Sequence, residues 1–296
     1  MIALSIGLIL IAGFLTALRQ SRALFATNES LAWLQDAGRN ALSVIVPDIE
    51  HAGFYGFAGT GVRVATLPAG ARDCGADFAV ALENPVQASN DRWPDSGADC
   101  APGASAGGAR AGADTLTLRH ASLAPSAPRA GRLQIYSRRL DSQSPMDLFG
   151  DGRAPGSVDE NHAVRDLEVR TYYIANDSVG RPGWPALRVK ALTESGGAAQ
   201  FRDEEVTPGV EDLQVELGVA GSDGRAVYVA PDDPMVRTAR IVAVRLWLRV
   251  RADSTESGFT DARPLGYASH VFQPTALESR QRRMLMERTV ALRNEP

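Results

Sequence analysis

The chain opens with eighteen residues, Met1 to Leu18, that carry no charged side chain. As a helix with a rise of about 1.5 Å per residue, this stretch is about 27 Å long, close to the roughly 30 Å hydrocarbon thickness of a bilayer. We therefore expect residues 1–18 to form a transmembrane anchor. The positions expected to pack in lipid and against other helices are Ile2, Leu4, Gly7, Leu8, Ile11, Gly13, Leu15 and Leu18.

Two other interpretations of this stretch are weaker. A cleaved signal peptide carries a basic region before its apolar core and a small-x-small site after it. The stretch begins without a basic residue, and the run Arg19-Gln20-Ser21-Arg22 does not supply such a site. A buried helix of a soluble core is rarely apolar on all sides for eighteen residues. The pattern favours a retained N-terminal anchor.

Residues 19–52 continue the helix with a different pattern. Polar residues fill much of the segment, and Gly38 and Pro47 are the only glycine and proline between Arg19 and Glu50. Apolar residues recur at helical spacing, so we expect one face to pack against a folded head. Pro47 predicts a kink or an early stop, because proline lacks an N–H and disfavours helical geometry before it. The predicted packing positions are Leu24, Leu31, Leu34, Leu42, Ile45 and Ile49.

After Ala113 the apolar residues recur at every second position, which is typical of half-buried strands. The clearest run is 242–251, where Val and Leu alternate with Arg and Trp, and we expect one face in the core and the other in solvent. Gly221-Ser-Asp-Gly is a turn signal that predicts a returning strand at 226–229. Further strands are predicted around 116–118, 133–135, 167–173, 187–191, 213–219 and 284–293.

Runs of strands without helices between them favour antiparallel sheets. The apolar stripe of residues 19–52 then has a sheet face to lie on. The sequence therefore predicts an α+β fold, in which a long N-terminal helix packs on an antiparallel β-sheet head formed by residues 114–296.

Residues 53–113 are dominated by Gly, Ala, Pro, Asp and Ser and predict a loop-rich insertion. Cys74 and Cys100, the only cysteines, lie in this insertion. Behind an export anchor the compartment is oxidising, so we expect the two cysteines to form a disulfide that pins the insertion. A two-cysteine metal site needs further ligands, and the four histidines show no ligand spacing. We expect no metal and no cofactor.

Signals for chemistry are weak. The net charge of −4 lacks the basic excess that nucleic-acid binding requires. Gly103-Ala-Ser-Ala-Gly matches the nucleophile-elbow pattern, but its flanks predict loops and not the strand and helix of that motif. Acidic clusters at 147–151, 203–205 and 232–233 lack calcium-loop spacing, and we interpret them as solvated loops, as we interpret the arginines of 280–293 as a solvated strand face. We expect a protein that is not an enzyme.

Several segments carry a family resemblance. The helix and its exit, Leu31-Ala-Trp-Leu-Gln-Asp-Ala-Gly-Arg-Asn-Ala-Leu and Asp48-Ile-Glu-His-Ala-Gly-Phe-Tyr-Gly, resemble those of type IV minor pilins of the PilW family. Further similar segments follow in order along most of the chain: Asp114-Thr-Leu-Thr-Leu-Arg, Val169-Arg-Thr-Tyr-Tyr-Ile-Ala-Asn, Gly209-Val-Glu-Asp-Leu-Gln-Val-Glu and Arg282-Arg-Met-Leu-Met-Glu-Arg-Thr-Val-Ala-Leu-Arg-Asn.

One feature departs from that family. Pilin-like proteins begin with a short basic leader, a Gly at the cleavage point, a Phe and, four residues later, a Glu, whereas this sequence starts just inside the point where those residues end. A start codon assigned too late, a trimmed chain and a lost processing site all explain this. We expect a start upstream, because a chain with the rest intact and no leader cannot be processed.

The resemblance implies a minor pilin, anchored once in the bacterial inner membrane with its head in the periplasm and incorporated into the pilus. Its expected partners are other minor pilins, the major pilin and the inner-membrane assembly platform, and its expected role is to prime or cap type IV pili through helix–helix packing. A minor pseudopilin of type II secretion has the same helix and head. A membrane-tethered periplasmic binding domain or hydrolase is the alternative of a different class.

Overall fold

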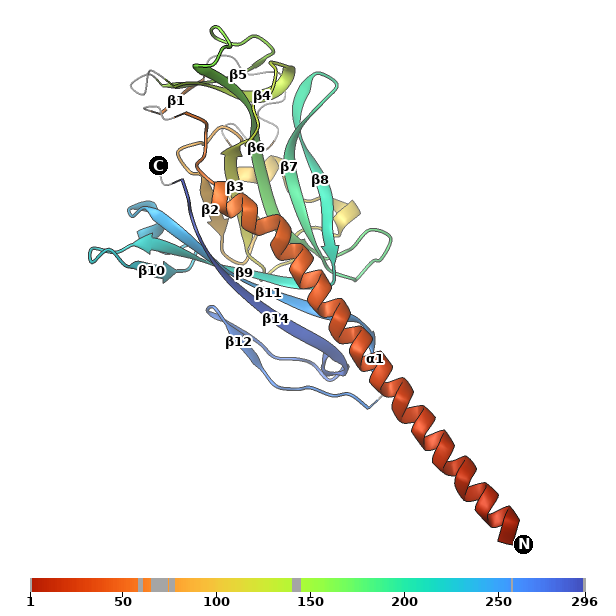
Figure 1. Ribbon diagram of the computed structural model, residues 1–296. Coiled ribbons are helices and arrows are strands. Elements are labelled where there is room, and N and C mark those ends of the chain that lie inside the picture. The colour runs from red at the N-terminus through yellow and green to blue at the C-terminus, as the bar shows by residue number, and fades with distance from the viewer. Residues whose placement is uncertain are drawn as a thin grey trace.

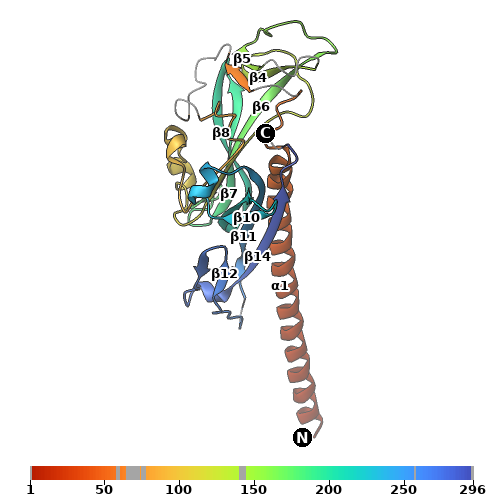
Figure 2. The same ribbon diagram turned by 90° about the vertical axis from the view of Figure 1, so that its left-hand side faces the viewer.

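The computed structural model describes residues 2–57, 61–64, 74, 78–139, 145–256 and 258–294. One long helix, α1 (Ile2–His51), carries a head of β-strands on its C-terminal half, while its N-terminal half projects away from the head (Figures 1 and 2). The predicted α+β class, with a long N-terminal helix packed on a β-sheet head, is confirmed.

The head consists of strands joined by loops and short 3-10 helices. Its strands are β1 (Val62–Val64), β2 (Val86–Ser89), β3 (Thr115–Ala121), β4 (Ala130–Arg138), β5 (Met146–Asp151), β6 (His162–Ala175), β7 (Ala186–Ser195), β8 (Ala198–Pro208), β9 (Val210–Ala220), β10 (Ala226–Val229), β11 (Ile241–Thr255), β12 (Leu265–Tyr267), β13 (His270–Phe272) and β14 (Gln281–Ala291). Its 3-10 helices are η1 (Asp95–Cys100), η2 (Ala104–Ala106), η3 (Pro234–Arg237) and η4 (Glu278–Arg280).

Within the described residues the strands form three sheets. An eight-stranded sheet has the order β1-β5-β4-β6-β3-β2, with β7 and β8 joined to it through β6. A four-stranded sheet has the order β10-β9-β11-β14, and β12 pairs with β13 as a hairpin. The pairing is antiparallel as predicted, except that β1 and β5 run parallel. β1 belongs to residues 53–113, which were predicted to be a loop-rich insertion, so this pairing was not predicted.

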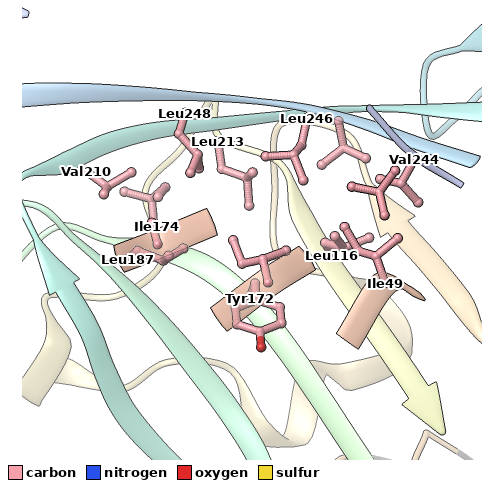
Figure 3. Close-up of a cluster of buried hydrophobic side chains, with 14 of the residues drawn as sticks. Ile49, Leu116, Tyr172, Ile174, Leu187, Val210, Leu213, Val244, Leu246 and Leu248 are labelled. Carbon is pink, nitrogen blue, oxygen red and sulfur yellow. The ribbon is translucent and has the colours of Figure 1, made fainter. Parts of the chain in front are cut away.

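The main core lies where α1 and the two large sheets meet. Leu34, Ala41, Ile45 and Ile49 follow one face of α1 and are fully buried. Figure 3 shows Ile49 beside side chains that come from both sheets. These include Leu116, Tyr172, Ile174 and Leu187 of the eight-stranded sheet, and Val210, Leu213, Val244, Leu246 and Leu248 of the four-stranded sheet. The helix is therefore a structural part of the head.

Helix α1 passes through Pro47 and ends at His51, so the predicted early stop at Pro47 is wrong. Proline removes one helical hydrogen bond, but Ile45 and Ile49 on either side of it are buried and hold the last turn in place. The chain then turns at Gly53, whose φ is +81° and whose N–H donates to the carbonyl of Arg119 at 3.0 Å. A positive φ of this kind favours glycine.

A second core covers the other side of the eight-stranded sheet. Cys74 and Cys100 form the predicted disulfide, 26 residues apart in sequence. Both cysteines, together with Phe78 and Leu82, pack on side chains of β3 to β7. The sheet side chains of this core are Ala121, Leu133, Ile135, Leu148, Leu167, Val169 and Leu192. Because both of its faces are covered, β3 is buried along its whole length.

Candidate functional site

The N-terminal half of α1 exposes a set of large apolar side chains. Phe14 is 65% exposed and Leu15 is 50% exposed, although both are residues that usually lie in a core. The other exposed members are Ile6, Leu10, Ile11, Leu18, Leu24 and Phe25. Of the predicted packing positions, the side chains of Ile2, Leu4 and Leu8 lie outside the described part of the structure. A contiguous apolar surface of this kind marks an interaction surface.

Small residues interrupt this surface. No atom of the described residues lies within 4 Å of a Cβ added to Gly7 or Gly13. Glycine inside a helix costs about 1 kcal/mol relative to alanine, but it lets a second helix approach closely. The hydroxyl of Thr16 donates to the carbonyl of Ala12 at 2.8 Å, so it is satisfied within the helix. The surface can therefore pack against apolar helices.

In the part of α1 that the structure describes, as in the rest of the described chain, no apolar stretch is long enough to cross a membrane. The transmembrane anchor expected at residues 1–18 therefore stays a prediction.

The C-terminal half of α1 holds the head. Leu34, Ile45 and Ile49 are fully buried, and Leu42 is half-buried against the same core. Leu24 is 65% exposed and Leu31 is 37% exposed, so the prediction that they pack on the head is wrong. The head does reach this part of α1, since Ser30 is buried and Thr27 bonds to Glu256, but it leaves these two leucine side chains partly uncovered. These two side chains instead extend the exposed apolar surface toward the head.

Two glycines bring the helix and the sheets into close contact. A Cβ on Gly38 of α1 would collide with the side chain of Met286 in β14. A Cβ on Gly209, between β8 and β9, would collide with the ring of Trp33. Gly209 also has φ +81°, which disfavours any other residue. Trp33 packs edge-to-face on Trp184, with 6.4 Å between ring centroids.

A buried carboxylate joins the last turns of α1 to the eight-stranded sheet. Asp48 is 5% exposed and accepts hydrogen bonds from Arg170 Nη1 at 2.9 and 3.1 Å and from the Tyr172 hydroxyl at 2.5 Å. His120 Nε2 lies 3.4 Å from the same carboxylate. Burial alone raises the pKa of Asp48, but the nearby His120 ring, the charge of Arg170 and the hydrogen bond from Tyr172 outweigh it and hold that pKa below its ordinary value. Asp48 is thus a buried carboxylate that stays negatively charged and fixes the last turns of α1 to the eight-stranded sheet.

Polar contacts extend along the rest of this seam. Thr27 donates to Glu256 at 2.9 Å, and Glu256 also pairs with Arg282 at 2.5 Å. At the other end Arg293 pairs with Glu50 at 2.9 Å. The contacts run from Thr27 to Glu50, so the head grips about half of α1 and leaves the other half uncovered.

The candidates for chemistry are not brought together. The described residues contain no group of three or more His, Cys, Asp or Glu side chains that could hold a metal. Ser105 of the elbow-like pattern lies in η2, which follows η1 and not a strand. His120 lies in β3 and is buried beside Asp48, and its ring centroid lies 6.0 Å from that of His51.

Two predictions of solvated charge are wrong. Asp147 is fully buried, and its carboxylate pairs with Arg63 at 2.6 Å and with Arg138 at 2.7 Å. Arg283, in the basic C-terminal strand, is also nearly buried and pairs with Glu211 at 2.5 Å. Both charges are paired inside the head: Asp147 links β5 to β1 and β4, and Arg283 links β14 to β9 across β11. The sequence pattern gave no sign of this, because the partners are distant in the chain.

The chain thus combines a helix half with exposed apolar side chains, a two-sheet head that holds the other half, and a disulfide. Residues 171–294 match the family model of type IV pilus-assembly protein W. The predicted resemblance to the PilW family is confirmed over this part of the chain. Among solved structures, a type IV-like pilin from Thermus thermophilus shares 13% identity over 88% of this chain and 97% of its own, with a TM-score of 0.39. No curated protein sequence matches the chain.

Proposed function

We propose that this chain is a minor pilin that primes or caps a type IV pilus by packing its stalk helix against the helices of other pilins. The observation that carries the proposal is the exposed apolar half of α1, continuous with a half that is buried in the head. An apolar helix of this kind needs lipid or partner helices to cover it.

In this proposal residues 1–18 are the anchor half of the stalk and residues 19–52 join it to the head. Residues 53–113 are the disulfide-pinned segment that adds β1 and β2 to the head, and residues 114–296 form the rest of the β head in the periplasm. Gly7 and Gly13 permit the close approach of neighbouring helices in lipid. When the subunit leaves the membrane, partner helices replace the lipid. The partners are other minor pilins, the major pilin and the inner-membrane assembly platform, and the head itself needs no cofactor for this role.

The test places one charge on the exposed surface. Leu15→Glu puts a carboxylate where the proposal requires contact with apolar helices, and an acidic residue at the centre of a membrane helix costs about 2.5–3.5 kcal/mol. We expect surface pili to be lost while the fluorescence of Trp33 and Trp184 shows a folded head. Gln20→Glu is the matched control, since it adds the same charge at an exposed position that is already polar. Normal piliation by the Leu15→Glu variant would refute the proposal.

A further inference from the structure

The edge strand β2 presents unpaired backbone groups. β2 is the last strand of the eight-stranded sheet and pairs only with β3 among the described residues. Arg119 N–H donates to the carbonyl of Pro85 at 2.9 Å, and Val86 lies opposite Leu118. In antiparallel pairing, the N–H and C=O of Val86 and Ala88 then point away from β3. Among the described residues, no backbone–backbone hydrogen bond reaches these four groups.

These groups face a groove of about 1030 Å³. β2 lines one side of the groove, and the connection between β10 and β11 lines another. Val236, Arg237 and Ile241 line the far side. The volume is enough for an extended segment of four or five residues beside β2.

The edge is held rigidly from behind. Arg119 of β3 is fully buried, and its guanidinium donates to the carbonyls of Phe78 and Asn84 and to the side chain of Gln87 in β2, at 2.8 to 3.0 Å. Burial lowers the pKa of Arg119 to about 10, so it stays charged at neutral pH. A fixed edge avoids the entropy loss of ordering a strand when a segment binds.

The two faces of β2 specify the side chains of such a segment. Val86 and Ala88 face the main core, where Val236 and Ile241 are also partly buried. Gln87 faces the opposite way and donates to Ser96 at 3.0 Å. Residues opposite each other in paired strands point to the same face. A segment with apolar side chains at alternate positions and polar ones between them therefore fits.

A second copy of this chain does not fit as well. In each copy β2 shares its groove with residues of the 90–96 segment and of the 231–241 segment, so a second copy must bring its own flanking residues into the same groove to pair edge to edge. A loose extended segment has no such flanking residues. Strand addition to a sheet edge is a general mode of peptide recognition, in which backbone bonds give affinity and alternate side chains give specificity.

We propose that the free edge of β2 is a strand-addition site that binds an extended segment, apolar at alternate positions, of another pilus subunit. The site rests on the proposed function for the identity of this partner. Through it the head contacts its neighbour by main-chain hydrogen bonds, in addition to the packing of the stalk helices.

The test uses the full chain in cells that assemble the pilus. A photoreactive benzoylphenylalanine replaces Arg237 on the far wall of the groove, and the cross-linked product is identified by mass spectrometry. We expect a cross-link to an extended segment of another pilin. Ala88→Pro removes one outward N–H and leaves the β2–β3 bonds intact. The yield of the cross-link should fall about fivefold or more, because one backbone hydrogen bond and the free edge are lost.

Ala226→Pro is the matched control. Arg225 accepts a hydrogen bond from Gly221 N–H, so the N–H of Ala226 also points outward, on the free edge of β10 away from the groove. This variant should cross-link as the parent chain does. Equal yields from the Ala88→Pro and Ala226→Pro variants overturn the inference. So does a cross-link to a second copy of this chain or to a protein outside the pilus.

A second measurement leaves the protein unchanged. The purified full chain in detergent is titrated with the acetylated peptide Thr-Val-Thr-Val-Thr, and with the same peptide N-methylated at both valines, which are the residues that would bond to the edge. We expect the methylated peptide to bind about tenfold more weakly or worse. Equal binding overturns the strand-addition site. If Leu15→Glu abolishes pili while the edge tests fail, the proposed function stands without this site.

Discussion

Asp48 is the most sensitive point at which to test how the head holds its stalk. Replacing it with alanine removes the acceptor of two hydrogen bonds from Arg170 and of one from Tyr172. The Tyr172 hydroxyl belongs to a fully buried side chain and keeps only its longer hydrogen bond to the Val44 carbonyl, at 3.4 Å. The guanidinium of Arg170 is one-third exposed and can be partly hydrated.

The expected loss follows from these contacts. Removing one member of a buried ion pair costs about 3–5 kcal/mol, and the partial exposure of Arg170 reduces that value. We therefore expect Asp48→Ala to lower the free energy of unfolding by about 3 kcal/mol. Asp48→Asn keeps an oxygen that accepts from Tyr172 and should cost about 1.5 kcal/mol, close to the value of a hydrogen bond to a charged group.

The assay is urea unfolding of the full chain in detergent, followed by tryptophan emission, because Trp33 and Trp184 meet at the seam of helix and head. The matched control is Asp36→Ala, on an exposed position of the same helix, which should change stability by less than about 0.5 kcal/mol. Since the folded-state pKa of Asp48 is lowered, its contribution is present above about pH 4 and lost as pH falls. A loss below about 1 kcal/mol for Asp48→Ala, or an unchanged acid dependence, would refute this account of the anchor.

Two further predictions concern the contact between the sheets and the helix. Gly209→Ala should lower the free energy of unfolding by about 3 kcal/mol, because it combines a left-handed backbone with displacement of Trp33. Gly180→Ala, at φ +70° with open space around it, should lower it by about 1 kcal/mol in the same assay. Equal losses of stability in the two variants would contradict the role of Trp33. Burial raises the pKa of Asp114 to about 7, above its unfolded value, so the stability it contributes is full below about pH 4 and declines toward pH 7. Asp114→Asn should abolish this decline in urea unfolding measured between pH 4 and 7, and a decline that persists would show that another group causes it.

Alternation of apolar and polar residues and turn signals correctly predict the strands that bury one face in the core and expose the other. The turn at Gly221 and the strand 226–229 are found as β10 with the same bounds, and the alternation at 242–251 lies within β11. The last strand, predicted at 284–293, is β14 and begins three residues earlier. β8 was missed, because its sequence Phe201-Arg-Asp-Glu-Glu shows charges where a strand with one core face shows apolar residues. In the structure those charges pair across to β7, as Asp203 does with Arg188 at 2.9 Å.

The sequence patterns do not show which side chains are buried by segments that are distant in the chain. The outer face of β11 was predicted to be in solvent, yet Arg249 is nearly buried there. It pairs with Glu211 at 2.8 Å and lies over the ring of Phe272 in the β12–β13 hairpin. Asp48 was missed for a similar reason, since its partners Arg170 and Tyr172 are more than a hundred residues away. The periodicity of apolar residues indicates that one face of an element is buried. It does not identify which charged residues, distant in sequence, form ion pairs with one another.

The grip of the head on α1 has a consequence for synthesis of the chain. The helix is made first, and β14, which packs against it, is made last: Gln281 follows Ile49 by 281 − 49 = 232 residues. At about 5–20 residues per second, translation of that interval takes roughly 12 to 46 s. During this time the apolar face of residues 34–49 has no completed cover. A chain that ends before residue 281 therefore lacks β14, one of the strands that cover its own helix. Folding of the subunit can be completed only after the C-terminal strand has been synthesised.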